Sequence, residues 1–384
     1  MTKNLKTRQA VVRGMHRMAA IAAGAVMVFG TTSPAHADDA ANTNPDWSKI
    51  FTFSGFGTAG VTHSSLGAAD YTDNLFQPKG AGASSRYSFT NTTKMGAQVN
   101  AQFTNQLSAV VQLITQEDYN NSYAPTVEWA NIKYAFTPDL SIRAGRIALP
   151  SFLSADYRNV GYANPWVNAP AEVYNLLPIT NSDGVDASYK VHFSNFYNTV
   201  QALYGSNNTH VPGPIKVAVK DLFGVFDTVE KGALTARVGY EQGNVTLGPF
   251  PTQSLRFYNI GAGYDPGDWF VQSEWARATV GHVIPGYSSW YLMGGYRIQK
   301  FTPYVMVSNE KSLHDTTFYP SARQGQKDHS VGVRWDFYKN ADLKVQYDHV
   351  TLPGNAAGYF INPQKNFSLG SSANVISAVL DFVF

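Results

Sequence analysis

The chain of 384 residues contains no cysteine, which excludes disulfide bonds and thiolate metal sites. Charged residues are also scarce, at 15% of the chain against roughly 25% in soluble domains. Beyond the N-terminal region, no stretch approaches the roughly 18 consecutive apolar residues of a membrane-spanning helix. Aromatic residues, in contrast, make up 14% of the chain. The sequence therefore calls for a fold that uses few charges and needs neither disulfides nor spanning helices.

Residues 1–37 have the three parts of an export signal. Five basic residues and no acid precede the apolar run 18–30, and Ala35-His36-Ala37 offers a small-residue cleavage site. The apolar run is too short to cross a bilayer as a helix. We predict a signal peptide over 1–37 and a short lead segment over 38–49, with the start of translation open between Met1 and Met15.

The net charge of the remaining chain is slightly negative. Removing residues 1–37 takes away five of the 29 basic residues, which leaves 24 bases against 27 acids and a formal charge of −3. The basicity of the full chain therefore belongs largely to the export signal. No clustered basic footprint remains, so nucleic acid is not an expected partner. An exported, aromatic-rich chain with few charges favours a β-barrel of the outer membrane.

Segments of about ten residues with alternating apolar and polar side chains recur along the chain. In residues 185–193, for example, the odd positions are apolar or aromatic and the even positions are polar. This period and length are typical of transmembrane strands with one face toward lipid and one toward water, whereas soluble sandwiches use strands of about 5–6 residues. The predicted strands are 50–61, 92–104, 107–117, 126–136, 139–148, 184–193, 196–205, 218–228, 232–241, 256–265, 268–278, 287–298, 300–309, 329–338, 341–351 and 374–384.

The links between these segments alternate between long and short. Outer-membrane barrels have short periplasmic turns, long external loops and an even number of strands. We therefore predict an all-β fold, a closed transmembrane antiparallel barrel of about sixteen strands over residues 50–384. The links expected to be long are 62–91, 118–125, 149–183, 206–217, 242–255, 279–286, 310–328 and 352–373.

The last segment ends on an aromatic residue. Ile376, Leu380 and Phe382 share one apolar face, while Ser377 and Asp381 lie on the other. Taken alone, this segment would also fit an inner strand of a soluble sandwich. With the other strands, we expect it to close the barrel by pairing with residues 50–61.

Three stretches carry a resemblance to the Gram-negative general porin family: IFTFSGFGTAGV (50–61), RAGRIALP (143–150) and the terminal DFVF. The resemblance implies a sixteen-stranded barrel, commonly a homotrimer, whose third external loop follows the fifth strand and folds into the lumen. Here the longest link, 149–183, follows the fifth predicted strand, although the enterobacterial loop pattern PEFGG is absent. The resemblance also implies that the terminal aromatics, Phe382 and Phe384, form a signal for the outer-membrane assembly machinery.

The same resemblance implies a pore constriction in which loop acids face wall bases. The candidate acids of the loop are Asp156, Glu172 and Asp183. The candidate wall bases are Lys94, Lys133, Arg143, Lys190 and Arg146, of which Arg146 has the other parity and needs a bulge to face the lumen. Each base also fits an ordinary solvated position in the lumen, and the loop aromatics are expected to pack the loop against the wall.

The most favoured function is passive diffusion of small hydrophilic solutes and ions through this pore. A substrate-selective channel with a binding site at the constriction is the main rival, followed by a barrel hydrolase and an adhesin. No GxSxG, HExxH or P-loop motif occurs, and the histidines lack metal-ligand spacing. We therefore expect no catalytic residue, metal or cofactor, and as partners outer-membrane lipids, further copies of the chain and the assembly machinery.

Overall fold

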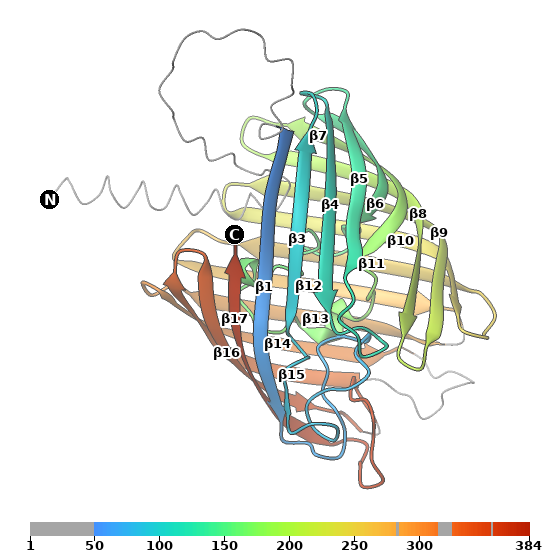
Figure 1. The fold of residues 1–384 in the computed structure, drawn as a ribbon, viewed down its shortest axis with the longest axis vertical. Coiled ribbons are helices and arrows are strands. Elements are labelled where there is room, and N and C mark those ends of the chain that lie inside the picture. The colour runs from blue at the N-terminus through green and yellow to red at the C-terminus, as the bar shows by residue number, and fades with distance from the viewer. Residues whose placement is uncertain (1–49, 282–283, 314–324, 355) are drawn as a thin grey trace, which may run out of the picture.

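The computed structural model describes residues 50–281, 284–313, 325–354 and 356–384. In this part of the chain, sixteen long strands form a closed antiparallel β-barrel, and a two-residue strand, β2 (Tyr87–Ser88), lies beside β1. Figure 1 shows β1, β3 and β4 side by side on the near side of the barrel. The predicted fold is confirmed, while the predicted signal peptide and lead segment lie outside the described residues.

The barrel strands follow one another in chain order, each antiparallel to its neighbours. β1 pairs with β17 from Phe56–Val383 to Ser64–Val375, which closes the ring as predicted. The bounds of the barrel strands are β1 (Phe51–Ser64), β3 (Lys94–Gln102), β4 (Leu107–Gln116), β5 (Thr126–Ala135), β6 (Leu140–Ala148), β7 (Asn181–His192), β8 (Tyr197–Val211), β9 (Ile215–Lys231), β10 (Leu234–Leu247), β11 (Gln253–Tyr264), β12 (Trp269–Val280), β13 (Ile284–Tyr296), β14 (Phe301–Ser312), β15 (Gly325–Tyr338), β16 (Ala341–Thr351) and β17 (Ser372–Val383).

The two faces of each strand differ in the way the alternation predicts. In β17, Ile376 and Leu380 are 48% and 39% exposed on the outside of the barrel, whereas Ser377 and Asp381 are 0% and 1% exposed on the inside. A closed barrel leaves no strand edge, so all its backbone groups can pair without water. In the described residues, no helix combines the length and apolarity needed to cross a membrane.

The two ends of the barrel differ from each other in the length of the links between strands. At the end near the chain's C-terminus, which we call the turn end, two- to four-residue links join the strands; the opposite, loop end carries the long links. Three links that we expected to be long (206–217, 242–255 and 279–286) are short hairpin ends, because their strands continue. Toward the loop end, beyond the alternating segment, the side chains on both faces of these strands are polar, as at Asn208 and Thr209. These residues still pair with the next strand, but no two-residue alternation in the sequence reveals it.

Strand length divides the barrel into two walls. In the short wall, β3–β6, the strands have nine or ten residues. In the tall wall, β8–β15, they have 12 to 17. At about 3.3 Å per residue, a nine-residue strand matches the thickness of a bilayer core and a longer strand projects beyond it.

The tall wall carries two rows of exposed aromatic side chains on its outward face. The row nearer the turn end includes Tyr264, Trp269, Tyr296, Phe301 and Trp335. The row nearer the loop end includes Tyr204, Tyr258 and Trp290, with Trp275 paired to Trp290 across the ladder. Such rows mark the two boundaries of the apolar layer of a membrane barrel.

Candidate pore constriction

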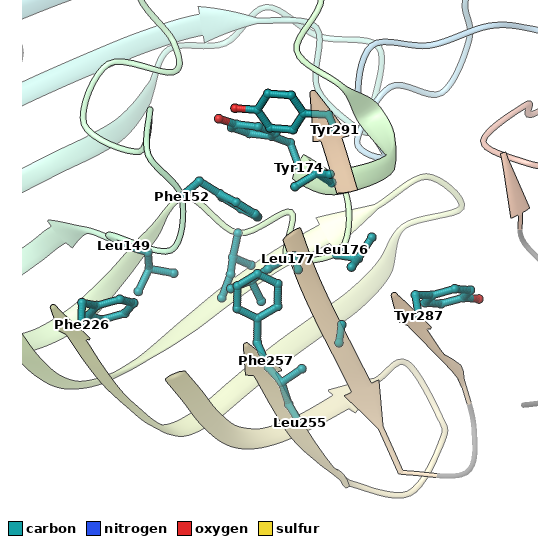
Figure 2. Close-up of a cluster of buried hydrophobic side chains, with 14 of the residues drawn as sticks. Leu149, Phe152, Tyr174, Leu176, Leu177, Phe226, Leu255, Phe257, Tyr287 and Tyr291 are labelled. Atoms are coloured by element: carbon teal, nitrogen blue, oxygen red, sulfur yellow. The ribbon is translucent and has the colours of Figure 1, made fainter. Parts of the chain in front are cut away.

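The link between β6 and β7, residues 149–180 and called loop 3 here, folds into the lumen and lies on the inner face of the tall wall, as predicted. It contains a 3₁₀ turn, η1 (Gly161–Ala163), and one short helix, α3 (Ala171–Tyr174). The Phe152 ring stacks on Tyr174 at 4.6 Å and meets the wall residue Phe257 at 5.5 Å. Figure 2 shows these loop and wall side chains in one buried cluster.

A buried carboxylate of the tall wall holds both ends of this loop. Tyr174 Oη and the wall hydroxyl Tyr291 Oη each donate to Glu274 Oε1 at 2.9 Å. The backbone N–H of Leu153 donates to Glu274 Oε2 at 2.9 Å. A second wall acid, Glu241, accepts from Ser151 Oγ at 2.7 Å. Three hydrogen bonds from loop 3, those of Ser151, Leu153 and Tyr174, therefore join it to two buried acids of the wall.

Basic residues of the wall hold the middle of loop 3 through its carbonyls. Lys344 Nζ donates to Gly161 O at 2.7 Å and to Asp381 Oδ2 at 2.9 Å. Arg334 Nη1 donates to Tyr162 O at 2.6 Å, and its guanidinium lies 4.7 Å above the centre of the Tyr162 ring. The loop is therefore bonded to the tall wall from β10 to β15 and to the neighbouring strand β16.

Glu172, a predicted acid of the constriction, is instead an anchor. It lies in α3, is 1% exposed, and accepts from Ser308 Oγ at 2.8 Å and from Gln326 Nε2 at 2.7 Å. Burial raises the pKa of this carboxyl. The prediction for Glu172 is wrong, because both of its oxygens point into the wall and are occupied there.

The opening lies on the other side of the loop. A cavity of about 120 Å³ separates loop 3 from the inner faces of β1, β3 and β5 and from residues 65–93, called loop 1. Its lining includes the bases Lys94 and Arg158 and the acids Asp73, Glu128 and Asp381. Burial raises the pKa of Asp73 while Lys94 and Arg158 act in the opposite direction, and burial lowers the pKa of Arg158. Charges of both signs therefore meet in this cavity.

Four of the predicted wall bases face the lumen. Lys94 lines the cavity, while Lys133 and Lys190 are exposed nearer the turn end. Arg143 lies opposite Lys133 and opposite Asp186, and its Nε donates to Asp186 Oδ1 at 3.0 Å. The charge of Arg143 is therefore neutralised by Asp186 of the neighbouring strand β7.

The predicted loop acid Asp156 is partly exposed on loop 3. Its carboxylate interacts electrostatically with the short-wall residue Arg143. Among the three predicted acids it is the one whose placement suits a role at the constriction.

Two of the predicted lumen residues point outward instead. Arg146 Nε and Nη2 bond to Asp183 Oδ1 and Oδ2, each at 2.7 Å, and Arg146 Nη1 donates to Val127 O at 3.0 Å. The pairing of β6 with β7 contains no bulge, so both residues share the face of Val185, which is 49% exposed on the outside. The predictions for Arg146 and Asp183 are wrong because strict alternation holds here.

Sequence reasoning missed Asp73, Glu128 and the position of Arg158. Glu128 escapes the alternation because Gln112 pairs with Trp129 and Leu113 with Val127, which leaves Glu128 as the extra residue of a bulge. Asp73 belongs to loop 1, and no local sequence pattern predicts that this loop folds inward. The sequence places Arg158 in loop 3 but does not show that its guanidinium lies over the rings of Phe152 and Tyr174 and lines the cavity.

Phe382 and Phe384 lie on the outward face at the seam of the barrel. Their rings stack at 6.4 Å, and a Cβ atom at Gly57 or Gly55 would come within 2.3 Å of Phe382 Cζ or Phe384 Cζ. Two backbone hydrogen bonds of 3.0 Å join Phe384 to Gly55. The glycines thus make room for the rings that cover the first strand, while the predicted assembly signal stays a prediction.

Comparisons with known proteins agree with a barrel of the porin type. A model of the Gram-negative porin family matches residues 19–355, whereas no curated protein matches the chain. The outer membrane channel DcaP of Acinetobacter baumannii has a similar structure, with a TM-score of 0.61 at 12% identity over 87% of this chain and 97% of that one.

Two further solved structures are similar to the chain. The anion-selective porin from Comamonas acidovorans gives a TM-score of 0.58 at 14% identity over 87% of this chain and 99% of that one. The trimer form of the outer membrane protein OmpT of Vibrio cholerae gives 0.54 at 14% identity over 87% and 100%. At these identities the likeness concerns the fold alone.

Proposed function

Because the chain belongs to the Gram-negative porin family, we propose that it forms a water-filled pore for passive diffusion of small hydrophilic solutes and ions across the outer membrane. Family and fold both indicate a channel rather than an enzyme. The observation that carries the proposal is loop 3, which is bonded across one wall of a closed barrel and leaves a charged opening beside the other. A barrel of about sixteen strands is wide enough to hold water unless it is filled.

The side chains around the opening support a pore for charged and polar solutes. Lys94, Lys133 and Lys190 project from the short-wall side, and Asp156 projects from loop 3. Opposed charges lining a narrow aqueous passage set its ion preference and align dipolar solutes. We propose these four residues as the charges that a passing solute meets.

The proposed assembly is a homotrimer in which the short wall contacts the other copies. Its strands are the shortest of the barrel, and its outward side chains include the exposed aliphatic residues Leu113 and Ile132. One of the similar structures is titled as a trimer form. Contact between copies would bury this apolar surface in a way that needs no lipid.

The experiment that tests the pore is reconstitution of the purified protein in a planar bilayer. We expect stepwise increases of current that vary linearly with voltage, and heat-unfolded protein as the control should give none. A correctly folded barrel that gives no conductance would refute the proposed function.

A substrate-selective channel is the second candidate, since Arg158, Lys94 and Asp73 converge on one cavity. Solutes of graded size and charge separate the two. A general pore passes them in order of size and charge, whereas a binding site gives saturable block of the current by one solute class.

We also propose that Phe384, with Phe382, serves the outer-membrane assembly machinery. Deleting Phe384 should lower the amount of inserted barrel in cells more than it alters the conductance of the barrels that insert. Equal insertion of the shortened chain would contradict this role.

A further inference from the structure

Four basic side chains gather on the outward face of the tall wall at its loop end. They are Arg256 of β11, Arg277 of β12, Lys311 of β14 and Lys327 of β15, called the basic belt here. All four are exposed, and none makes a hydrogen bond or ion pair with another described residue. Because they lie outside the barrel, the proposed pore gives them no role.

Strand register places these charges in one row. Arg277 lies opposite Ser288, and Ser288 lies opposite Lys311 on the next strand. Arg256 and Lys327 extend the row at its two ends. Arg277 lies directly opposite Tyr258, two residues from Arg256. Lys311 lies directly opposite Gly325, two residues from Lys327. Diagonal neighbours of this kind are about 7–8 Å apart. Arg277 and Lys311 lie on either side of Ser288, about two strand spacings or 10 Å apart, so the four charges form one row across β11–β15.

Among the described residues, none of the side chains paired directly with the four bases is acidic. The side chains paired directly with the four bases are short or neutral and can hydrogen bond, and several of them offer hydroxyls or amides to a ligand. Four like charges side by side repel one another unless an anion lies between them. The residues opposite the basic belt include Gln242, Thr279, Ser288, Asn309 and Thr351.

The depth of the belt identifies the anion. Arg256 lies two residues beyond Tyr258, and Arg277 two residues beyond Trp275, on the same face and toward the loop end. Aromatic rings favour the boundary between acyl chains and headgroups. One step beyond that boundary is the layer that contains the phosphate groups of lipids.

We propose that the basic belt binds the phosphate groups of lipids in the leaflet that surrounds the loop end. The inference goes beyond the diffusion pore and rests only on its proposed place in a membrane. Two guanidinium groups can each donate two hydrogen bonds to one phosphate, and the lysines add point charges. The comparable arginine of the short wall, Arg146, has its charge neutralised by Asp183 and offers no such site.

The test measures lipid binding to the purified protein in detergent micelles by native mass spectrometry. The probe is lipid A, a glycolipid with two phosphate groups, and its dephosphorylated form is the comparison. We expect the wild type to retain only the phosphorylated form. Each belt substitution to Gln should weaken binding about fivefold, and the quadruple variant R256Q/R277Q/K311Q/K327Q should weaken it more than a hundredfold.

A matched variant removes the same number of charges at the turn end: K133Q/K190Q/K231Q/K300Q. It should bind the lipid as the wild type does, and excess inorganic phosphate should not displace the lipid. Undiminished binding by the belt variant, equal loss in both variants, or equal retention of the dephosphorylated lipid would overturn the proposal. Displacement by inorganic phosphate would also overturn it, in favour of a site for soluble anions. Because no current is measured, these outcomes are independent of whether the pore conducts.

Discussion

The short wall and the tall wall follow the same two-residue alternation but have opposite environments on their two faces. Inside, the tall wall is covered by loop 3, and the wall binds the loop through Glu274, Glu241 and Arg334. The inner face of the short wall is open and presents Lys94 and Lys133 to the lumen. Alternation alone therefore does not say which lumen positions touch water.

The outward faces of the two walls also differ. Near the loop end the tall wall has exposed aromatic rings followed by the basic belt, a pattern suited to lipid. In the loop-side halves of β3–β7, the exposed large apolar residues are Met95, Leu113, Val127 and Val185, none of them aromatic. A wall without interfacial aromatics at one boundary is suited to contact with protein, which supports the proposed trimer.

The largest expected effect concerns the inner faces of the two walls, of which only the tall one binds loop 3. Replacing Glu274 with Ala removes the acceptor shared by Tyr174, Tyr291 and the Leu153 amide, so loop 3 should detach from the tall wall. Losing several hydrogen bonds to one buried charged group costs about 3 kcal/mol or more. Single-channel recordings should then show a larger and noisier current.

The control for this change is an inward acid of β7, the strand next to the short wall. Asp186→Ala frees Arg143 without touching loop 3, so the current should keep its wild-type noise while its ion preference changes. Equal noise in the two variants would mean that loop 3 is not held by the tall wall.

The second prediction tests the outer faces with a matched pair of isoleucines. Ile132 on the short wall and Ile260 on the tall wall are 56% and 55% exposed. Ile132→Trp should disrupt trimers, because overpacking a protein contact costs about 1–3 kcal/mol. Ile260→Trp should leave trimers intact, because fluid lipid accommodates the larger ring. Migration of unheated samples on gels reads both outcomes, and equal behaviour would remove the distinction between the walls.

Much of the fold was predictable because a barrel leaves two independent patterns in the sequence. Each strand such as 374–384 carries its own alternation, and the links add a second pattern of long and short. The extra length of β8 and β9 was not predictable in this way. Above the membrane both faces of a hairpin meet water, so the chemical contrast that marks a strand is lost.

The candidate constriction was less predictable because its residues are brought together by tertiary contacts. Lys94 follows strand parity and lines the cavity, and its role in a constriction stays a prediction. Glu128 was missed because a bulge changes its face, and Glu172 was misassigned because an acid on an inserted loop can turn toward either the lumen or the wall. Local sequence does not distinguish these orientations.

The third prediction sharpens the comparison at the pore itself. Lys94→Gln should shift the permeability ratio toward cations, and Asp156→Asn should shift it toward anions. Removing a unit charge about 4 Å from an ion in water changes its energy by about 1 kcal/mol, which is a change of about fivefold. Glu172→Gln, whose carboxyl faces the wall, should leave the reversal potential unchanged. A shift for Glu172 as large as that for Asp156 would return Glu172 to the lumen.

The smallest effect concerns Arg146 and Asp183, the ion pair on the outward face of β6 and β7. Pairs that are exposed to water contribute about 0–1 kcal/mol. If another copy of the chain covers the short wall, water is excluded, and Arg146→Gln and Asp183→Asn should each weaken the trimer more than the double variant does. The coupling energy, from thermal dissociation of the four proteins, should lie near the upper end of that range. A coupling of zero would place the pair among hydrated headgroups, and the short wall would then face lipid as the tall wall does.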